Sequence, residues 1–457
     1  MKRENPSSST TAAKPSRREF LQIGGTVAAA SALAGVALPR VHAAEDNTIR
    51  LALIGCGGRG SGAVVNAFEA TGGPVKLVAM ADLFENRLKV SHASLTELHP
   101  DKMDVPADRQ FIGFDAYRKA IDCLRPGDIA MACTYPAFRV AHLDYAVAKG
   151  VHVFMEKSFA TDPVGIRRII KAGEAAEKKN LKIAAGLMCR HSKNRQELIR
   201  RIREGELGDI NLIRAYRMEP VGPMGPKPAA DNEILWQIRN SIRFLWVSGS
   251  LWAEMDIHQI DEICWLKDAW PVSAHGICGR AANSTDCSQN PDSFSVEWTF
   301  ADGAKAYDVV RYLPNCHDEF DTFVHGTKRA AQFSGPIHVG MVHTYKDQRC
   351  DPNNIDWRAP KEEITPWQAE WNVLLDAIRN DRPHNEAKRA AYSNLADMMG
   401  RAAMHTGRVI TWDEMMTSNF EWVPGGIDAV NENSKPWLVA DAQGRYPVPV
   451  PGQWNEV

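Results

Sequence analysis

The chain has 457 residues, of which 44% are hydrophobic and 24% charged, and its formal net charge is −2. This length is sufficient for two or three domains with their own cores, and the composition is that of an ordinary globular protein. A nearly neutral chain lacks the positive field that binding to a phosphate backbone requires, so we expect no nucleic-acid partner.

The first 44 residues have the pattern of an export signal. Arg17 and Arg18 precede a run of 16 apolar and small residues from Ile23 to Leu38, and Ala43 and Ala44 suit cleavage. This pattern predicts a twin-arginine signal, the Tat translocase as a partner during export, and a periplasmic or otherwise exported mature protein. A membrane anchor is the alternative, but a bilayer span takes about 20 residues. We therefore expect no membrane association after cleavage.

A glycine-rich turn follows the first predicted strand of the mature chain. After the apolar run Ile49–Ile54, glycines fall at G-x-G-x-x-G spacing, and a helical pattern begins directly behind them. Such glycines permit a tight turn, the approach of a pyrophosphate and close packing of helix on strand. A glycine-rich turn of another α/β protein is the alternative. The residues predicted to bind the dinucleotide here are Gly55, Gly57, Gly58, Arg59 and Gly60.

Asp82 ends the second predicted strand, Val75–Ala81, and lies 22 residues after Gly60. Dinucleotide-binding folds place at this distance the carboxylate that accepts hydrogen bonds from the adenosine ribose. A carboxylate repels a 2′-phosphate, so the sequence favours NAD over NADP, with Arg87 as the residue that can shift this preference. The alternative role of Asp82 is to cap the following helix.

Two further strands end in polar residues. The buried run Asp128–Cys133 is followed by Thr134 and Tyr135, and the run Val151–Met155 is followed by Glu156 and Lys157. Ligands of doubly wound sheets collect at the carboxyl ends of parallel strands. We therefore expect all four residues at the cofactor, and we predict an NAD-binding Rossmann domain over residues 45–186.

Consecutive strand patterns without helices between them dominate residues 187–365. They predict an α+β domain with a large open, mostly antiparallel sheet that carries the substrate. One strand, Phe294–Phe300, has Phe294, Val296 and Trp298 on alternate positions. An exposed apolar face of this kind is a liability in a monomer, so we expect a homo-dimer or homo-tetramer. Residues 366–457 are predicted to form two helices, about 366–380 and 386–406, and an irregular Pro-rich tail over the surface.

The predicted helix 250–266 carries the second candidate for chemistry. Glu254 and His258 are four residues apart, so a carboxylate and an imidazole share one helix face. An exposed acidic helix with a structural histidine is the alternative for this pattern when it is taken alone.

Taken together, these motifs resemble one family. The glycine fingerprint, Asp82, Glu156-Lys157, Arg190 after Gly186, and the pattern Ser-Gly-Ser-x-x-x-Glu-x-x-x-His-x-x-Asp over 248–261 occur in the order of the Gfo/Idh/MocA oxidoreductases. The resemblance covers nearly all of the mature sequence.

The resemblance implies a Rossmann domain followed by an α+β domain, a nicotinamide cofactor and a sugar or polyol substrate. It assigns Lys157 and His258 as catalytic residues, with Glu254 in the place of the family's aspartate. We expect Arg190, Trp252 and Asp256 at the substrate. Ser158 replaces the family's proline, Asp256 stands at a usual glycine, and Arg139 replaces a histidine.

The nine cysteines form no C-x-x-C pair. Cys56, Cys133 and Cys189 lie in or beside apolar runs, where a cysteine usually behaves as a small hydrophobe. We expect no disulfide framework and no metal site.

The resemblance implies hydride transfer at a sugar or polyol hydroxyl, and the export signal adds the expectation of a cofactor that is tightly bound and recycled in place. One alternative is an NAD-dependent glycosidase or lyase that works by transient oxidation and elimination. The alternative from another class is a non-catalytic sugar-binding protein.

Overall fold

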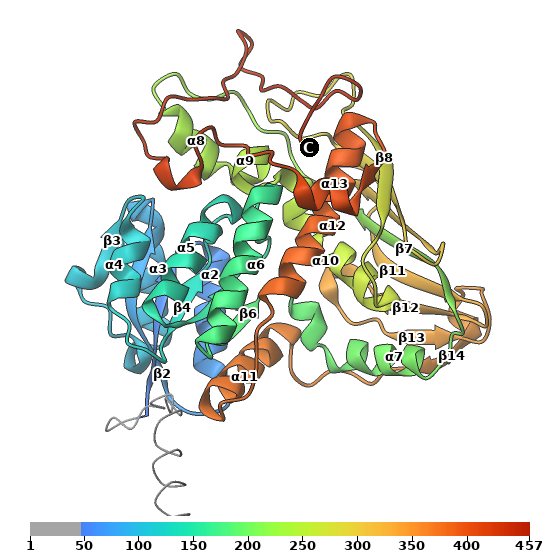
Figure 1. Ribbon diagram of the computed structural model, residues 1–457, viewed down its shortest axis with the longest axis horizontal. Helices are drawn as coiled ribbons and strands as arrows, with labels where there is room; N and C mark the ends of the chain where they lie inside the picture. Colours follow the sequence, from blue (N-terminus) through green and yellow to red (C-terminus); the bar gives the residue numbers. More distant parts are fainter. Residues whose placement is uncertain (1–46) are drawn as a thin grey trace, which may run out of the picture. The chain divides into compact units, whose positions relative to one another are not determined.

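A six-stranded parallel sheet forms the first half of the computed structural model, which describes residues 47–457 (Figure 1). Its strand order is β3-β2-β1-β4-β5-β6, the order of dinucleotide-binding folds. The strands are β1 Ile49–Ile54, β2 Val75–Asp82, β3 Gln110–Ile112, β4 Ile129–Ala132, β5 His152–Met155 and β6 Ile183–Ala185. The helices between them are α2 Gly58–Glu69, α3 Glu85–Leu98, α4 Ala116–Asp122, α5 Pro136–Lys149 and α6 Pro163–Lys178. The predicted Rossmann fold is confirmed.

Local sequence sets the boundaries of these elements. Every residue of β4 and β5 is buried, as expected for parallel strands that helices cover on both faces. Helix α6 begins after Asp162, whose Oδ1 accepts a hydrogen bond of 2.8 Å from the backbone N–H of Gly165. Helix α5 ends at Gly150, which has a φ of +76° that glycine adopts at little cost.

The second sheet has nine strands in the order β14-β13-β12-β11-β7-β10-β9-β8-β15. The parallel pair β7–β10 stands among antiparallel neighbours, so the predicted mostly antiparallel sheet is confirmed. The strands are β7 Ile210–Met218, β8 Ser273–Gly279, β9 Ser293–Thr299, β10 Lys305–Arg311, β11 Glu319–Gly326, β12 Ala330–Ser334, β13 His343–Tyr345, β14 Ile355–Arg358 and β15 Ile410–Thr411. The last three were not expected, because runs of two to four residues give no clear alternation.

The remaining helices are distributed around this second sheet and along the C-terminal segment. They are α7 Lys193–Arg203, α8 Glu233–Arg239, α9 Leu245–Ser248, α10 Ser250–Lys267, α11 Pro366–Arg379, α12 Ala387–Thr406 and α13 Trp412–Thr417. Among residues 47–457, no helix combines the length and the apolar character that crossing a bilayer takes.

The face of β9 that we expected to be exposed is covered. Phe294, Val296 and Trp298 are only 3%, 1% and 1% exposed. Helix α12 lies on this face, and the indole N–H of Trp298 donates to the backbone oxygen of Ala396 at 3.1 Å. The alternation correctly marks an apolar face, but its partner is a helix of the same chain. The apolar-face argument for an oligomer is therefore wrong.

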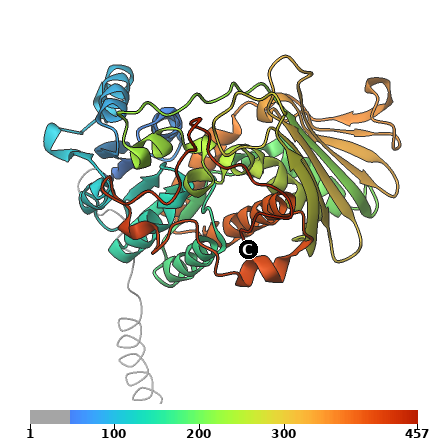
Figure 2. The same cartoon turned by 90° about the horizontal axis from the view of Figure 1, so that it is seen from above.

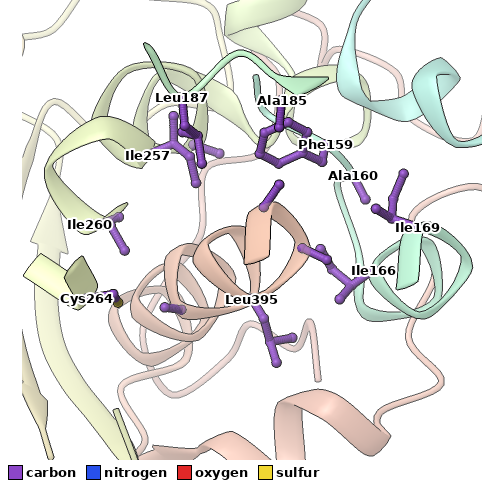
Figure 3. Close-up of a cluster of buried hydrophobic side chains, with 14 of the residues drawn as sticks. Phe159, Ala160, Ile166, Ile169, Ala185, Leu187, Ile257, Ile260, Cys264 and Leu395 are labelled. Carbon is purple, nitrogen blue, oxygen red and sulfur yellow. The ribbon is translucent and has the colours of Figure 1, made fainter. Parts of the chain in front are cut away.

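Helix α12 joins the two halves of the molecule. It packs between α6 and α10, where Leu395 lies in one cluster with Ile166 and Ile257 (Figure 3). The same helix is seen from two directions in Figures 1 and 2. Helix α11 packs on the first sheet, with the ring of Trp371 stacked 4.6 Å from that of Phe154. Both C-terminal helices are thus part of the hydrophobic core.

Most residues of the irregular tail, 424–457, are at least partly exposed, but Glu456 near its end is buried. The Glu456 side chain accepts hydrogen bonds from Arg401 Nε at 2.9 Å and from His405 Nδ1 at 3.1 Å. All three residues are at most 1% exposed. Proline spacing predicted an irregular path correctly, but it gave no sign of this long-range ion pair. The predicted export signal, residues 1–44, lies outside the described residues.

Candidate active site

A cavity of about 250 Å³ opens at the carboxyl ends of the first-sheet strands. Eight of the ten predicted cofactor residues line it: Gly55, Gly57, Gly58, Arg59, Gly60, Asp82, Thr134 and Tyr135. Helix α2 begins at Gly58, so its unpaired backbone N–H groups lie at this wall of the cavity. This is the arrangement that binds a pyrophosphate.

The structure explains the glycines of the turn in two ways: two positions have no room for a side chain, and two face open space. A Cβ atom on Gly60 would lie 2.1 Å from the backbone oxygen of Gly55, so this contact excludes any side chain. Gly55 has a φ of +99°, and a Cβ there would lie 2.6 Å from the Cys133 carbonyl carbon. By contrast, a Cβ on Gly57 or Gly58 would meet no described atom within 4 Å. The turn therefore presents bare backbone to the cavity, which fits a dinucleotide.

Asp82 fixes the glycine turn and also lines the cavity. Its carboxylate accepts hydrogen bonds from the backbone N–H groups of Cys56 at 2.7 Å and Phe84 at 2.8 Å. The N-cap of α3 is Phe84, so Asp82 is not the helix cap. Arg87 lines the same cavity and donates to the Tyr135 hydroxyl at 2.8 Å. Both an acid and an arginine thus lie where a ribose would bind.

The two remaining cofactor residues lie at the end of β5. Glu156 is 3% exposed and pairs with Arg59, whose Nε lies 2.6 Å from Glu156 Oε1. Lys157 Nζ lies 3.2 Å from Glu254 Oε2 and also donates to the Glu254 backbone oxygen. The fold therefore brings together two predicted catalytic residues that are 97 positions apart in the chain.

His258 lies one turn beyond Glu254 on α10 and is 5% exposed. Burial lowers the pKa of His258 well below its ordinary value, and the nearby His338 and Lys157 lower it further. The imidazole is therefore neutral at physiological pH, the state that accepts a proton. Within residues 47–457, its Nδ1 atom has no hydrogen-bond partner.

Two of the predicted substrate residues are misplaced. Trp252 is fully buried, stacks on Trp298 and donates to the Asp397 backbone oxygen at 3.2 Å. Asp256 is also fully buried and accepts a hydrogen bond of 2.5 Å from the Tyr312 hydroxyl. Positions two apart on a helix point about 200° apart, so neither residue shares the face of Glu254. The predicted substrate contacts of Trp252 and Asp256 are therefore wrong.

Arg190 is held by a structural partner. Its guanidinium makes a two-pronged ion pair with Asp261, with Nε–Oδ2 and Nη2–Oδ1 distances of 2.8 and 2.9 Å. It also lies over the Trp265 ring, 5.1 Å from the centroid. The ion pair occupies Nε and Nη2 of Arg190, and its role at the substrate stays a prediction.

Sequence reasoning missed two residues beside His258. Cys189 follows β6, and its Sγ lies 3.9 Å from Nδ1 of His338, whose ring centroid is 4.3 Å from that of His258. Cys189 could have been noticed because the carboxyl end of β6 faces the same edge as that of β5. His338 lies in a turn between β12 and β13, where no pattern marks it.

The two-sheet arrangement is that of known sugar and polyol dehydrogenases. Scyllo-inositol dehydrogenase from Lactobacillus casei superposes with a TM-score of 0.59 at 18% identity, covering 80% of this chain and 98% of that one. Aldose-aldose oxidoreductase from Caulobacter crescentus superposes with a TM-score of 0.61 at 17% identity, covering 80% and 99%. These similarities establish the fold.

Part of the chain is also similar in sequence to a polyol dehydrogenase. Inositol 2-dehydrogenase from Cereibacter sphaeroides is 26% identical over 193 residues, which are 42% of this chain and 51% of the relative. The match thus spans about half the length of this relative. No protein-family model matches the chain.

Proposed function

We propose that the protein is an NAD(P)-dependent oxidoreductase of the Gfo/Idh/MocA type that acts on a sugar or polyol hydroxyl. The observation that carries this proposal is the Lys157–Glu254 pair at the end of β5, one helical turn from a neutral His258. Glu156, next to Lys157, pairs with Arg59 in the wall of the proposed dinucleotide cavity. A related fold has been solved with NAD(H) and scyllo-inositol bound, in the L. casei dehydrogenase with a TM-score of 0.58.

In this proposal the side chains divide the work on the substrate hydroxyl. A bound nicotinamide supplies the hydride acceptor. The neutral His258 imidazole takes the hydroxyl proton as the carbinol C–H bond breaks. Lys157 donates a hydrogen bond to the same oxygen, and the Glu254 carboxylate, 3.2 Å from Nζ, holds the ammonium in place.

The test of this function starts with the purified mature protein. We expect denaturation to release a nicotinamide dinucleotide, because an exported enzyme depends on a cofactor that it carries and recycles. We then expect substrate-dependent absorbance of the reduced cofactor in a screen of polyols and sugars. Cleavage of aryl glycosides without net redox change would instead favour the transient-oxidation alternative. Absence of both cofactor and turnover would favour a sugar-binding protein.

The cofactor preference tests the role of Asp82. We expect the wild type to bind NAD more tightly than NADP, and Asp82→Asn to shift the ratio of the two dissociation constants at least about tenfold toward NADP. Asparagine removes the charge and keeps an oxygen for one of the two N–H groups of Cys56 and Phe84, which bind different oxygens of Asp82. Calorimetric titration with both dinucleotides measures the ratio. Tighter binding of NADP by the wild type would assign the ribose site to Arg87 instead.

Export and assembly also remain proposals. We propose a twin-arginine route to the periplasm and a dimer or tetramer built on the outer face of the second sheet. On that face Ile277 is 72% exposed and Tyr307 is 38% exposed. Light scattering of the mature protein is expected to give at least a dimer, and Ile277→Lys is expected to weaken it. A monomer at micromolar concentration would contradict this assembly.

A further inference from the structure

Three metal-binding side chains converge next to the proposed catalytic pair. Cys189 comes from the 3₁₀ turn Met188–His191, His258 from α10, and His338 from the 3₁₀ turn Pro336–His338. Their candidate ligand atoms all lie within 4.8 Å of one another, and Cys189 Sγ is 3.9 Å from His338 Nδ1. In a tetrahedral zinc site, sulfur and nitrogen ligands lie about 3.3–3.6 Å apart. The cluster is therefore wider than an occupied zinc site, and binding has to draw the three side chains together.

We propose that Cys189, His258 and His338 form a binding site for a divalent transition metal, with zinc as the best fit. One thiol and two imidazoles are the donors that zinc prefers, whereas magnesium and calcium prefer oxygen. This proposal replaces our expectation that the protein has no metal site. That expectation rested on the absence of closely spaced cysteines, and here the ligands come from three distant segments.

The surroundings favour a metal over a simple polar contact. A Cys–His separation of 3.9 Å is at best a weak hydrogen bond, and in the described part of the chain His258 Nδ1 has no partner at all. A buried polar atom without a partner destabilises the fold, and coordination or a ligand removes that cost.

The nearby charges are compatible with a cation. Three positive side chains, Lys157, Arg195 and Arg217, lie close enough to act on the cluster, and each has a carboxylate close to it. Arg217 Nε lies 2.8 Å from Glu219 Oε1. Lys157 Nζ lies 3.2 Å from Glu254 Oε2, and Arg195 Nε lies 3.2 Å from Glu262 Oε1. Deprotonation of Cys189 on binding supplies one further negative charge. The net charge that a zinc ion adds to the site is therefore about +1.

The ligands are held in place by the fold. Arg195 Nη2 donates to the His338 backbone oxygen at 3.0 Å, and the His338 ring packs edge-on against Phe320 at 4.9 Å. His338 has a φ of +61°, an unusual conformation that this packing maintains. Residues held in this way often belong to functional sites.

Three protein ligands leave a fourth position open, as in catalytic rather than structural zinc sites. A His258 nitrogen that binds the metal cannot also accept a substrate proton. Whether the metal is bound would therefore decide whether His258 acts as a metal ligand or as a proton acceptor. The metal proposal rests on the geometry of the cluster and does not depend on the proposed oxidoreductase activity.

The test uses the full mature protein after removal of metals with a chelator. We expect titration to show one tightly bound zinc per chain. Cobalt is expected to give a tetrahedral visible spectrum and a thiolate-to-cobalt charge-transfer band. Cys189→Ala should remove that band, and Cys189→Ala and His338→Ala should each weaken zinc binding by at least about tenfold. Cys189→Ser, closer to cysteine in size, replaces Cys189→Ala if that variant fails to fold.

Matched controls separate this site from other thiols and imidazoles. Cys264→Ala removes another buried cysteine, and His275→Ala removes an exposed histidine of β8. Neither is expected to change zinc binding. Zinc binding that Cys189→Ala and His338→Ala leave unchanged, or a cobalt spectrum without the thiolate band, would overturn the proposal. Because zinc on His258 would itself block proton transfer, turnover is measured on the metal-free protein. Zinc binding together with no turnover of the metal-free protein would reject the proposed function alone, and turnover without any zinc binding would reject the metal site alone.

Discussion

Lys157→Ala is expected to lower turnover by about 10²–10⁴-fold while NAD stays bound, because it removes the ammonium next to the substrate hydroxyl. Lys157 Nζ is held by two oxygens of Glu254, and no other lysine is described in contact with that residue. Lys157→Arg should rescue little, because the broad guanidinium cannot replace a compact ammonium. Steady-state kinetics together with NAD titration measures both effects.

The control for this variant is Lys171→Ala, which removes an exposed lysine of α6 and should leave turnover unchanged. The turnover of His258→Ala should fall by a factor similar to that of Lys157→Ala. The double variant should lose little more than the worse single one, since residues that act as a unit are not additive. Near-wild-type turnover of Lys157→Ala with NAD bound would remove Lys157 from the mechanism.

Glu456→Gln is expected to destabilise the fold by about 3–5 kcal/mol, because it leaves the Arg401 guanidinium buried without its counter-charge. Burial alone would raise the pKa of Glu456, but Arg401 and His405 outweigh it and lower the pKa from 4.5 to about 2. A lowered folded-state pKa stabilises the protein above about pH 4.5, and this contribution is lost as the pH falls toward 2.

The measurement is thermal unfolding of the wild type and Glu456→Gln between pH 3 and pH 7. The difference in stability should be largest near neutral pH and should shrink as the pH falls toward 3. Glu432→Gln is the matched control, because it makes the same exchange at an exposed position of the tail. Equal melting temperatures of Glu456→Gln and wild type at pH 7 would show that the ion pair of Glu456 with Arg401 does not stabilise the fold.

The sequence alone determined the parts of this protein whose requirements are local. Gly55 and Gly60 are fixed by backbone contacts within a strand-turn-helix unit, so their spacing predicts that unit directly. The alternation of apolar residues predicted the second sheet, and the i, i+4 spacing placed Glu254 and His258 on one helix face. Thr134 and Tyr135, after β4, line the cavity, because parallel strands end at one edge of a sheet. The cofactor contact of Glu156 and Lys157, after β5, stays a prediction.

Only the tertiary structure decided the contacts between distant segments. Local alternation shows that the Phe294 face is apolar, but it cannot show that α12, about a hundred residues later, covers it. Helix rotation, and not spacing along the chain, turned Trp252 and Asp256 away from Lys157. The Arg401–Glu456 pair and the meeting of Cys189 with His338 depend on the packing of segments that share no sequence pattern, because burial and charge pairing are satisfied in three dimensions.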